Sequence, residues 1–521
     1  MRKLILILMA GLFAVPVAAL TPPAVENMDA ATLQAAMTDG RTTSAAITQA
    51  YLDRIARIDA AGPQLKAVIA LSPDALEQAR KLDAERAAGR VRGPLHGIPV
   101  LIKDNIEVAG PLPTTAGSLA LKANVTGRDA FLVARLRLAG AVFLGKTNLS
   151  EWANIRSGDS TSGWSAIGGL TRNPHDVTRS ACGSSSGSGA AVAASLAPLA
   201  IGTETDGSIV CPAGTNGIVG FKPTVGLVSR THIVPISHSQ DTAGPMTLTV
   251  ADAAAMLTVI AGTDRADRAT AMAREVQQDY VRALRPDALK GRRLGVMMDR
   301  IGGRADVRAL LDAALSTLEA EGAAIVRIAD TRTGLEELGG AEFEVLLTEL
   351  KADMAAYLAS LPGAGLPRTL AELIAFNKAQ PEELRWFGQE TFELAETKGG
   401  LDSEAYRTAK EKAARLAGPE GIDRLLKEHK VDFLIGVTNG PAWTMDLVNG
   451  DNFSGPSASQ LPAVAGYPHL TVPMGAVEGL PIGISFIGEK WSDAEVLAVG
   501  HRYELASRKR VVPEYRLGVG P

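Results

Sequence analysis

The chain has 521 residues, of which 46% are hydrophobic and 21% are charged, and its formal net charge at pH 7 is −4. This composition is typical of a globular protein, and the charge balance gives no reason to expect binding to nucleic acid or to an anionic membrane surface. The seven histidines lack the spacing of metal ligands, so we expect neither a metal nor another cofactor.

The first 19 residues have the pattern of a secretory signal peptide. Arg2 and Lys3 precede an apolar run over residues 4–15, and small residues at 17–19 form a cleavage site. The apolar run is too short to span a membrane. We therefore expect cleavage after Ala19 and a periplasmic or extracellular protein without a membrane span. An uncleaved N-terminal anchor is the alternative.

Helix and strand patterns alternate through the first half of the chain. In chain order, we expect helices at 43–58 and 73–88, a strand at 98–102, a helix at 129–139, a strand at 141–144, a helix at 189–195, a strand at 196–201 and a helix opened by a capping box at 249–252. This alternation predicts an α/β fold in which helices cover a large, mixed and mainly parallel sheet.

The pattern between residues 265 and 430 is different, because long charged amphipathic segments dominate it. Examples are 305–322 and 370–398, with short strands at 293–298 and 323–328. We interpret this region as a helical cap that sets substrate choice. The candidate lining residues are Trp386, Phe387, Trp443 and Met445, although aromatic residues at helical spacing more often pack in a core.

The last part of the chain returns to strand patterns. Apolar segments at 431–437, 470–472 and 482–487 predict strands that complete the sheet, and a capping box at 492–495 predicts a last helix. The length of the chain would suggest about three domains. Because strands at both ends of the chain contribute to one sheet, we instead expect a single domain over residues 25–515.

The run from Ser180 to Gly214 is the most unusual stretch of the sequence. It is rich in serine and glycine, its only charged residues are Glu204 and Asp206, and it contains no Lys or His. Glycine-rich turns allow backbone N–H groups to gather around a small group. The run presents serines in two turns, at 184–188 and at 207–208. A serine needs a base to become a nucleophile, and this stretch contains none.

Lys103 is a candidate base, because it follows its strand at the C-terminal edge, where sheet proteins place chemistry. Together with Ser184 and Ser208 it resembles the Ser-Ser-Lys triad of the amidase signature family. Further segments resemble that family's blocks in the family's order: GPLHGIPVLIKDN, DAFLVARLRLAGAVFLGKTNLSEWAN, GSSSGSGAAVAAS, GTETDGSIVCPAGTNGIVGFKPTVGLVSR, QDTAGPMT, AVAGYPHLTVPMG and LPIGISFIG.

The resemblance implies a serine amidohydrolase. Ser208 would be the nucleophile, Ser184 would pass protons between Ser208 and Lys103, and the Gly183–Ser184 peptide would be cis. Lys103 can act as a base only when it is neutral, which requires burial and a lowered pKa. The expected oxyanion hole consists of the backbone N–H groups of Thr205, Asp206 and Gly207.

Five further residues near these blocks are expected to have structural roles. Ser185 would be a hydrogen-bond partner, Lys146 a charge at a strand end and Asp241 a loop anchor. Cys182 and Cys211 each lie within three residues of a proposed catalytic serine and could pair in an oxidising compartment. Two free buried thiols are the favoured interpretation, because free Cys is among the most buried residue types.

Other functions fit the sequence less well. The segment 183–187 satisfies the G-x-S-x-G pattern of α/β hydrolases with Ser185 as nucleophile, but the polar residues before it do not form the required strand. No serine has a Lys three residues later, as the S-x-x-K enzymes require. Neither Gly187 nor Gly207 precedes a Lys, which disfavours a phosphate-binding exported protein without catalysis. The export signal disfavours the relatives that assist transamidation on tRNA in the cytosol, and an inactive relative remains as an alternative.

The residue three positions after Ser208 bears on the substrate. Relatives that hydrolyse dicarboxylic half-amides carry an Arg there to hold a carboxylate, whereas this chain has Cys211, which disfavours a small anionic substrate. The export signal and the serine-rich blocks most resemble the exported bacterial peptide amidases, which implies hydrolysis of the C-terminal amide of peptides by a monomer or homodimer. Aryl acylamides and fatty acid amides are the alternative substrates. Candidate substrate-binding residues are Asp206, Cys211 and Trp443.

Overall fold

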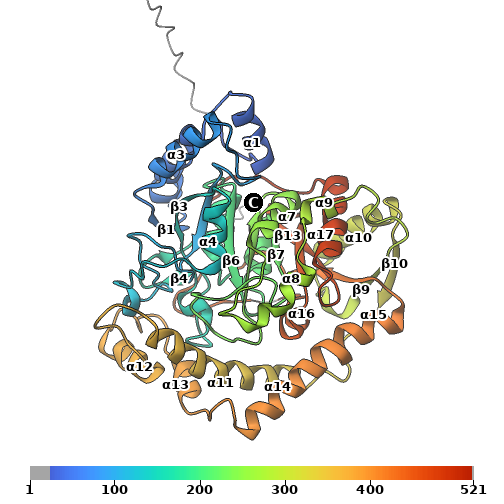
Figure 1. Cartoon of the computed structure of the whole chain (residues 1–521). Helices are drawn as coiled ribbons and strands as arrows, with labels where there is room; N and C mark the ends of the chain where they lie inside the picture. The colour runs from blue at the N-terminus through green and yellow to red at the C-terminus, as the bar shows by residue number, and fades with distance from the viewer. Residues whose placement is uncertain (1–23, 454, 519–521) are drawn as a thin grey trace, which may run out of the picture.

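The computed structural model describes residues 24–453 and 455–518, so the expected signal peptide lies outside the described residues. The strands are β1 (Val68–Leu71), β2 (Pro99–Lys103), β3 (Val142–Thr147), β4 (Trp164–Ser165), β5 (Gly169–Leu170), β6 (Leu199–Glu204), β7 (Val219–Lys222), β8 (Thr242–Thr247), β9 (Arg293–Met297), β10 (Ala324–Ile328), β11 (Phe433–Val437), β12 (His469–Val477) and β13 (Leu480–Ile487). Eleven of them form one sheet in the order β1-β3-β2-β6-β8-β7-β12-β13-β11-β9-β10 (Figure 1). The sheet confirms the predicted α/β class.

The sheet is mixed, as predicted, but parallel pairing does not dominate it. Parallel pairs join β2 to β3 and β6, and join β9 to β10 and β11. The other six neighbouring pairs in the described sheet are antiparallel. The expectation of a mainly parallel sheet is therefore wrong. Part of the reason is local, since β12 and β13 are joined by the short turn at Glu478 and Gly479, and a short turn can only connect antiparallel strands.

Helices cover the sheet, and most of them lie where the sequence predicts. They are α1 (Ala30–Thr38), α2 (Ser44–Arg54), α3 (Ala75–Ala87), α4 (Phe131–Leu138), α5 (Ser186–Ala193), α6 (Val210–Thr215), α7 (Val250–Ile260), α8 (Ala273–Val276), α9 (Tyr280–Ala283), α10 (Ala305–Ala320), α11 (Leu338–Ala359), α12 (Leu370–Ala379), α13 (Glu390–Glu396), α14 (Glu404–Ala417), α15 (Asp423–His429), α16 (Gln460–Ala465) and α17 (Asp493–Ser507). The expected cap at Thr249 is present, since its side chain accepts from Asp252 N, whereas the Ser492 side chain makes no cap hydrogen bond at the start of α17. The Thr43 side chain caps α2 by accepting from Ala46 N.

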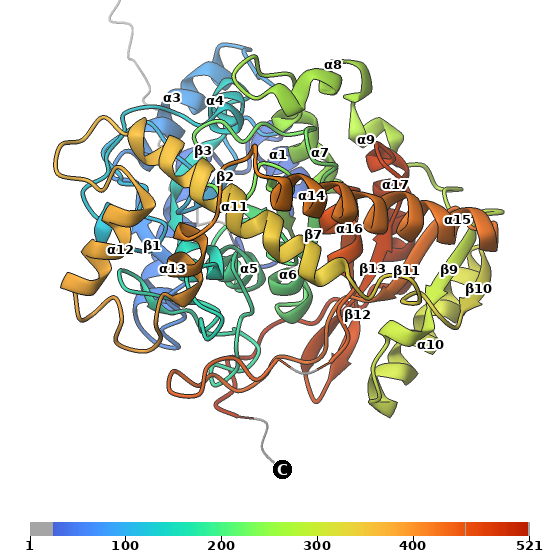
Figure 2. The same cartoon turned by 90° about the horizontal axis from the view of Figure 1, so that it is seen from below.

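The helical cap consists of α11 to α14, which form an arc along one side of the molecule, with α11 and α14 side by side (Figures 1 and 2). The earlier part of the variable region belongs to the sheet instead, because β9 pairs with β11 and β10 pairs with β9. The segment 370–398, expected as a long amphipathic part of the cap, is divided into α12 and α13. Pro381 lies in the break, and proline cannot donate the hydrogen bond that a continuous helix requires.

The core lies on both faces of the sheet. Strands β2, β3, β6, β7, β11 and β13 are buried along their whole length, which explains why their sequences are continuous apolar runs rather than alternating ones. None of the described helices is both long enough and apolar enough to cross a membrane.

Candidate active site

The site is built at the C-terminal ends of two neighbouring parallel strands. Ile102 of β2 pairs with Ile201 of β6, so Lys103 at the end of β2 lies beside the last residues of β6. The ends of parallel strands, where loops diverge, are the usual place for ligands in open sheets. The loop that precedes α5 brings Ser184 to the same place, and its Gly183–Ser184 peptide is cis, as the resemblance implied.

Lys103 is fully buried and surrounded by hydroxyl groups. Its Nζ lies 2.7 Å from Ser184 Oγ, 3.0 Å from Ser185 Oγ and 2.8 Å from Thr203 Oγ1. Burial lowers the pKa of Lys103 to about 7, although the charges of Asp241 and Glu204 oppose that shift. The side chain therefore has access to the neutral amine at mildly alkaline pH.

The hydrogen bonds around Lys103 fit a neutral amine, which has two N–H donors and one lone pair. Ser185 Oγ donates to Thr203 O at 3.0 Å and accepts from Thr203 N at 3.2 Å, so one lone pair remains to accept from Lys103. Thr203 Oγ1 is the second acceptor, and it also accepts from Asn105 Nδ2 at 3.0 Å. The lone pair of the amine is then left for the Ser184 hydroxyl, which is the direction of transfer that a general base requires.

Ser208 follows a turn that is fixed on both sides. On one side, Glu204 Oε2 accepts from Ile209 N at 2.7 Å and from Val210 N at 3.0 Å, at the start of α6. On the other, Thr205 Oγ1 donates to Asp241 Oδ1 at 2.6 Å. The backbone N–H of Ser185 donates to Ser208 O at 3.2 Å, which places Ser208 beside the Ser184–Ser185 segment.

The turn itself can bind an oxyanion. Gly207 has φ +77°, a left-handed conformation that glycine adopts without strain. Within the described residues, the N–H groups of Asp206, Gly207 and Ser208 donate to no backbone carbonyl. Three such donors next to the Ser208 hydroxyl are suited to bind a negatively charged oxygen.

Close backbone packing explains the glycines of the serine-rich run. A Cβ on Gly187 would lie 2.3 Å from Ala67 O and 2.5 Å from Asn148 O, so only glycine allows α5 to approach the neighbouring chain so closely. Every residue of α5 is buried. The glycines of this run therefore reflect the close packing of α5.

Cys182 and Cys211 form a disulfide, with their Cα atoms 6.0 Å apart. This corrects the expectation of two free thiols. The two cysteines flank the two serine-bearing segments, and the fold that brings Ser184 and Ser208 together also makes the cysteines neighbours. Their separation along the sequence gives no sign of that proximity. The sulfur of Cys211, a candidate substrate contact, is thus bonded to Cys182.

The residues expected to be structural have the corresponding contacts. Lys146 forms a buried ion pair with Asp104 at 3.0 Å and donates to Ile106 O at 2.7 Å. Asp241 accepts from the N–H groups of residues 236 and 237 and from the hydroxyl of Thr205, so it joins a loop to the proposed oxyanion turn.

Of the expected substrate contacts, Asp206 lies beside Ser208 and Trp443 does not. Asp206 is exposed next to Ser208. Trp443 donates to Asp451 Oδ1 at 3.0 Å. It lines a recess of about 320 Å³ together with Arg179 and Arg304, and none of Lys103, Ser184 and Ser208 lines that recess.

Two of the candidate lining aromatics, Trp386 and Phe387, pack against other side chains. Phe387 packs against Trp164, with ring centroids 5.2 Å apart, and lies 4.3 Å from the guanidinium of Arg156, so it is a core residue. Trp386 lies against Arg385.

Sequence reasoning missed Asn105, Thr203 and Glu204 as members of the site. A signal for all three was present, because they lie within the matching blocks that also contain Lys103 and Ser208. It missed Glu342 of α11 as well, whose pKa is raised to about 7 by burial and then by the charge of Asp206. No pattern in the variable region distinguished Glu342 from its neighbours.

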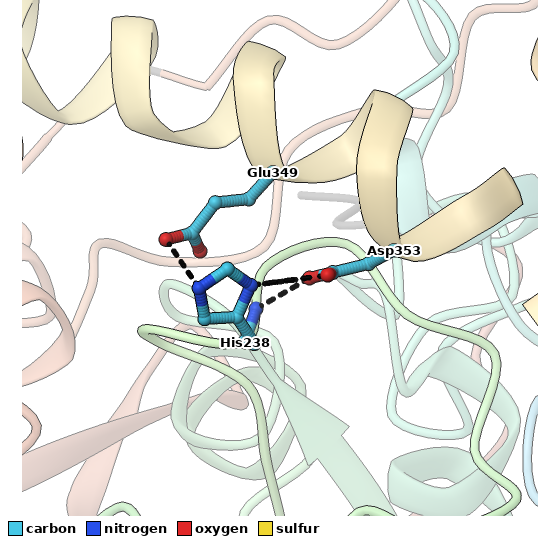
Figure 3. A group of neighbouring side chains, drawn as sticks. All are labelled: His238, Glu349 and Asp353. Carbon is cyan, nitrogen blue, oxygen red and sulfur yellow. Dashed lines mark hydrogen bonds and ion pairs between the residues drawn. The ribbon is translucent and has the colours of Figure 1, made fainter. Parts of the chain in front are cut away.

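His238, Glu349 and Asp353 form a compact cluster between a loop and α11 (Figure 3). His238 Nδ1 lies 2.9 Å from Asp353 Oδ2, and His238 Nε2 lies 3.1 Å from Glu349 Oε1. Three such groups resemble a metal site, but the Glu349 carboxylate already has several partners. They are Ser237 Oγ, Ser239 N and Oγ, Tyr406 OH and the ammonium of Lys410 at 3.2 Å. The cluster is an ion-pair network to which Lys410, and His238 when it is protonated, contribute positive charge.

Comparison with known proteins agrees with this geometry. A sequence model of the amidase family matches residues 46–497. A probable amidase from Arabidopsis thaliana is 39% identical over 494 residues, which cover 93% of this chain and 90% of that protein. The crystal structure of a peptide amidase with the competitive inhibitor chymostatin matches with a TM-score of 0.91 and 52% identity, covering 94% of this chain and 99% of that chain. Native peptide amidase from Stenotrophomonas maltophilia matches with a TM-score of 0.89 and 50% identity, again covering 94% of this chain and 99% of that chain.

The chain therefore belongs to the amidase family. Its single domain has the fold of that family, and it is an amide hydrolase.

Proposed function

We propose that the protein is an exported serine amidohydrolase that removes the C-terminal carboxamide of peptides as ammonia. The observation that carries this proposal is the buried contact of 2.7 Å between Lys103 Nζ and Ser184 Oγ at the end of β2, beside the turn that presents Ser208. The likeness to peptide amidases over nearly the whole chain supports the choice of substrate.

The proposed first half-reaction forms an acyl-enzyme. Ser208 Oγ attacks the amide carbonyl and passes its proton to Ser184 Oγ, which in turn gives its own proton to the lone pair of Lys103. The N–H groups of the turn at 205–208 hold the oxyanion. The tetrahedral intermediate then collapses, the proton returns from Lys103 through Ser184 to the nitrogen, and ammonia leaves.

The second half-reaction uses the same groups with water. Water loses a proton through Ser184 to Lys103 and attacks the ester carbonyl. Collapse of this second intermediate returns the proton to Ser208 Oγ and releases the carboxylic acid. A single base thus serves both steps because it returns to the neutral state at the end of each.

Variants of the triad test the roles directly. Ser208→Ala should abolish turnover, Lys103→Ala should nearly abolish it, and Ser184→Ala should lower the rate by roughly 10² to 10⁴, the usual worth of positioned proton transfer. The measurement is ammonia release from a peptide amide by purified protein. Ser185→Ala is the matched control, and a complete loss in that variant with activity retained in Ser208→Ala would make Ser185 the nucleophile.

The choice of substrate needs its own assay. Purified protein is offered a peptide amide, an anilide and a fatty acid amide, and release of ammonia or aniline is measured. The disulfide at Cys211 leaves no cation three residues after Ser208 to hold a small carboxylate substrate. Turnover of the anilide or the fatty acid amide with no turnover of the peptide amide would replace the proposed substrate while retaining the triad.

Export is proposed from the sequence of residues 1–19 alone. N-terminal sequencing of the protein recovered from the periplasm or the medium should begin at Leu20. Full-length protein retained in the cytosol would contradict this part of the proposal.

A further inference from the structure

Lys222, the last residue of β7, is a fully buried lysine that has no part in the proposed mechanism. Its Nζ donates to Pro223 O at 3.1 Å, which is its one side-chain hydrogen bond within the described residues. A buried ammonium is costly unless opposite charges lie close to it. Lys222 therefore needs nearby carboxylates to stay charged.

The strand registers place Lys222 on the same face of the sheet as Glu204. Glu204 of β6 pairs with Thr242 of β8, and Gly220 of β7 pairs with Met246 of β8. Residues directly opposite each other in an antiparallel pair share a face, and so do residues two apart along a strand. Glu204 and Lys222 therefore extend from the same face, on either side of β8.

Helix α6, which begins two residues after Ser208, packs on this face. A Cβ on Gly220 would lie 2.5 Å from Ala213 Cβ, and a Cβ on Gly244 would lie 3.1 Å from Ile209 Cδ1. Glycine on β7 and on β8 thus allows the start of α6 to rest directly on the sheet. The segment that follows Ser208 therefore lies on the same face as the two charged side chains.

Glu204 links Lys222 to this segment. Glu204 is 1% exposed, and its Oε2 accepts from Ile209 N at 2.7 Å and from Val210 N at 3.0 Å. Burial raises the pKa of Glu204, and the charge of Lys222 is the largest influence that opposes this rise, ahead of those two N–H groups. Lys222 thus favours the carboxylate, which is a stronger hydrogen-bond acceptor than the neutral acid.

Lys222 has two further carboxylates near it. Burial lowers the pKa of Lys222 to about 8, and the charges of Glu204, Asp493 and Asp206 oppose that shift, in decreasing order. Asp493 accepts from Thr224 N at 2.8 Å and from Thr224 Oγ1 at 2.6 Å. Its side chain has no other hydrogen bond in the described part of the chain, so Asp493 is a buried neighbour of Lys222 that does not bond to the proposed oxyanion turn.

We propose that Lys222 is a positioning residue of the amidase reaction. Its positive charge keeps the Glu204 side chain ionised, and this carboxylate fixes the N–H groups of residues 209 and 210, so that Ser208 stays in place at the start of α6. The inference rests on the proposed function, in which Ser208 is the nucleophile. It adds a residue that acts on Ser208 through Glu204.

A cycle of single and double variants tests the route through Glu204, with ammonia release from a peptide amide as the assay. Lys222→Met has a similar length and no charge. It should lower kcat about tenfold or more and change KM little, because Ser208 moves out of position while the contacts with substrate remain. In the Glu204→Gln background, Lys222→Met should lower kcat by less than about twofold, because no carboxylate is left there for the charge to act on.

Asp493→Asn provides the matched control background. If Lys222 only balanced buried negative charge, removal of either carboxylate would weaken the effect of Lys222→Met to a similar extent. We expect the full loss of kcat in Asp493→Asn. A Lys222→Met variant with the kcat of the wild type, or a loss that is equal in the Glu204→Gln and Asp493→Asn backgrounds, would overturn the proposal. Absence of amide hydrolysis by the wild type would instead overturn the proposed function.

A measurement on the wild type does not depend on the folding of Lys222→Met. The infrared difference spectrum between wild type and Glu204→Gln at neutral pH reports the ionisation of Glu204, because a protonated carboxyl group has a carbonyl band that a carboxylate lacks. We expect no such band for Glu204. Its presence would mean that Lys222 does not keep Glu204 ionised, and the proposal would be wrong.

Discussion

At the scale of single residues, the protonation of Lys103 depends on a balance between burial and two carboxylates. Burial disfavours the charged ammonium, whereas Asp241 and Glu204 favour it, and the result is a pKa of about 7. The hydrogen-bond partners of its Nζ are the hydroxyls of Ser184, Ser185 and Thr203 and the carbonyl of Thr203, all of them neutral groups. The residue is thus arranged as a base rather than as half of an ion pair.

The pH dependence of the reaction follows from this pKa. Because only neutral Lys103 accepts a proton, kcat/KM should rise with pH through a midpoint near 7 and level off above it. The measurement is ammonia release from a peptide amide over about pH 5.5 to 9. A rate that does not change over this range would show that Lys103 is not the base.

Thr203→Val tests whether the midpoint of the pH profile belongs to Lys103. The Thr203 hydroxyl accepts from Lys103, and such a bond is stronger to the ammonium than to the amine. Its removal should lower the pKa of Lys103 further and move the midpoint to lower pH. A shift to higher pH would contradict the hydrogen-bond directions that we assign.

At the scale of elements, the disulfide between Cys182 and Cys211 joins the segment before α5 to the start of α6. It closes a loop with a sequence separation of 29. Because the closed loop lowers the conformational entropy of the unfolded chain, the disulfide should raise the free energy of unfolding by about 3 to 4 kcal/mol. In the variant with both cysteines replaced by Ala, the free energy of unfolding measured by urea titration should be lower by that amount. Reductant should lower the midpoint of the wild type and leave that of the double variant unchanged.

The network of His238 joins α11 to the loop that carries Asp241. Hydrogen bonding to Asp353 raises the pKa of His238, with help from Glu349 and against the charge of Lys410. A raised pKa in the folded state stabilises the fold fully below the unfolded value of about 6.5, and this stabilisation is lost as pH rises through the folded value.

We expect His238→Gln to destabilise the protein more at about pH 5.5 than at about pH 9. The measurement is the difference between the urea midpoints of wild type and variant at the two pH values. His501→Gln is a suitable control, because His501 lies on α17, outside this network, with its ring 3.6 Å from Glu504. An equal loss for His238→Gln at both pH values would show that the ion pairs contribute nothing.

At the scale of the whole molecule, one sheet is assembled from distant parts of the chain. Strand β7 pairs with β12, and β9 reaches the rest of the sheet through β11 and β13. A chain that ends after Lys430 would lack β11, β12 and β13, which leaves β7 with an open edge and separates β9 and β10 from the others.

We expect that shortened chain to be insoluble or to unfold without cooperativity, as measured by urea titration of circular dichroism. Residues 431–521 supplied as a second chain should restore amide hydrolysis, because they provide the missing strands. Cooperative unfolding of the shortened chain by itself would mean that the first part forms an independent domain.

The sequence determined those features that depend on local pattern or on the order of matching blocks. The apolar run before Lys103 placed this residue at the end of β2, and caps such as Thr43 and Thr249 marked the starts of helices. The blocks that contain Ser184 and Ser208 identified the family and the groups that converge at one edge of the sheet.

Only the tertiary structure decided the features that depend on contacts between distant segments. The pairing of Cys182 with Cys211, the excess of antiparallel strand pairs and the break between α12 and α13 all differ from what the sequence indicated. A cavity beside Asn105 combines β6, a loop and α11, and the network of His238 combines a loop with two helices. Periodicity along a chain reports which face of an element is buried, but it carries no information on which other element covers that face.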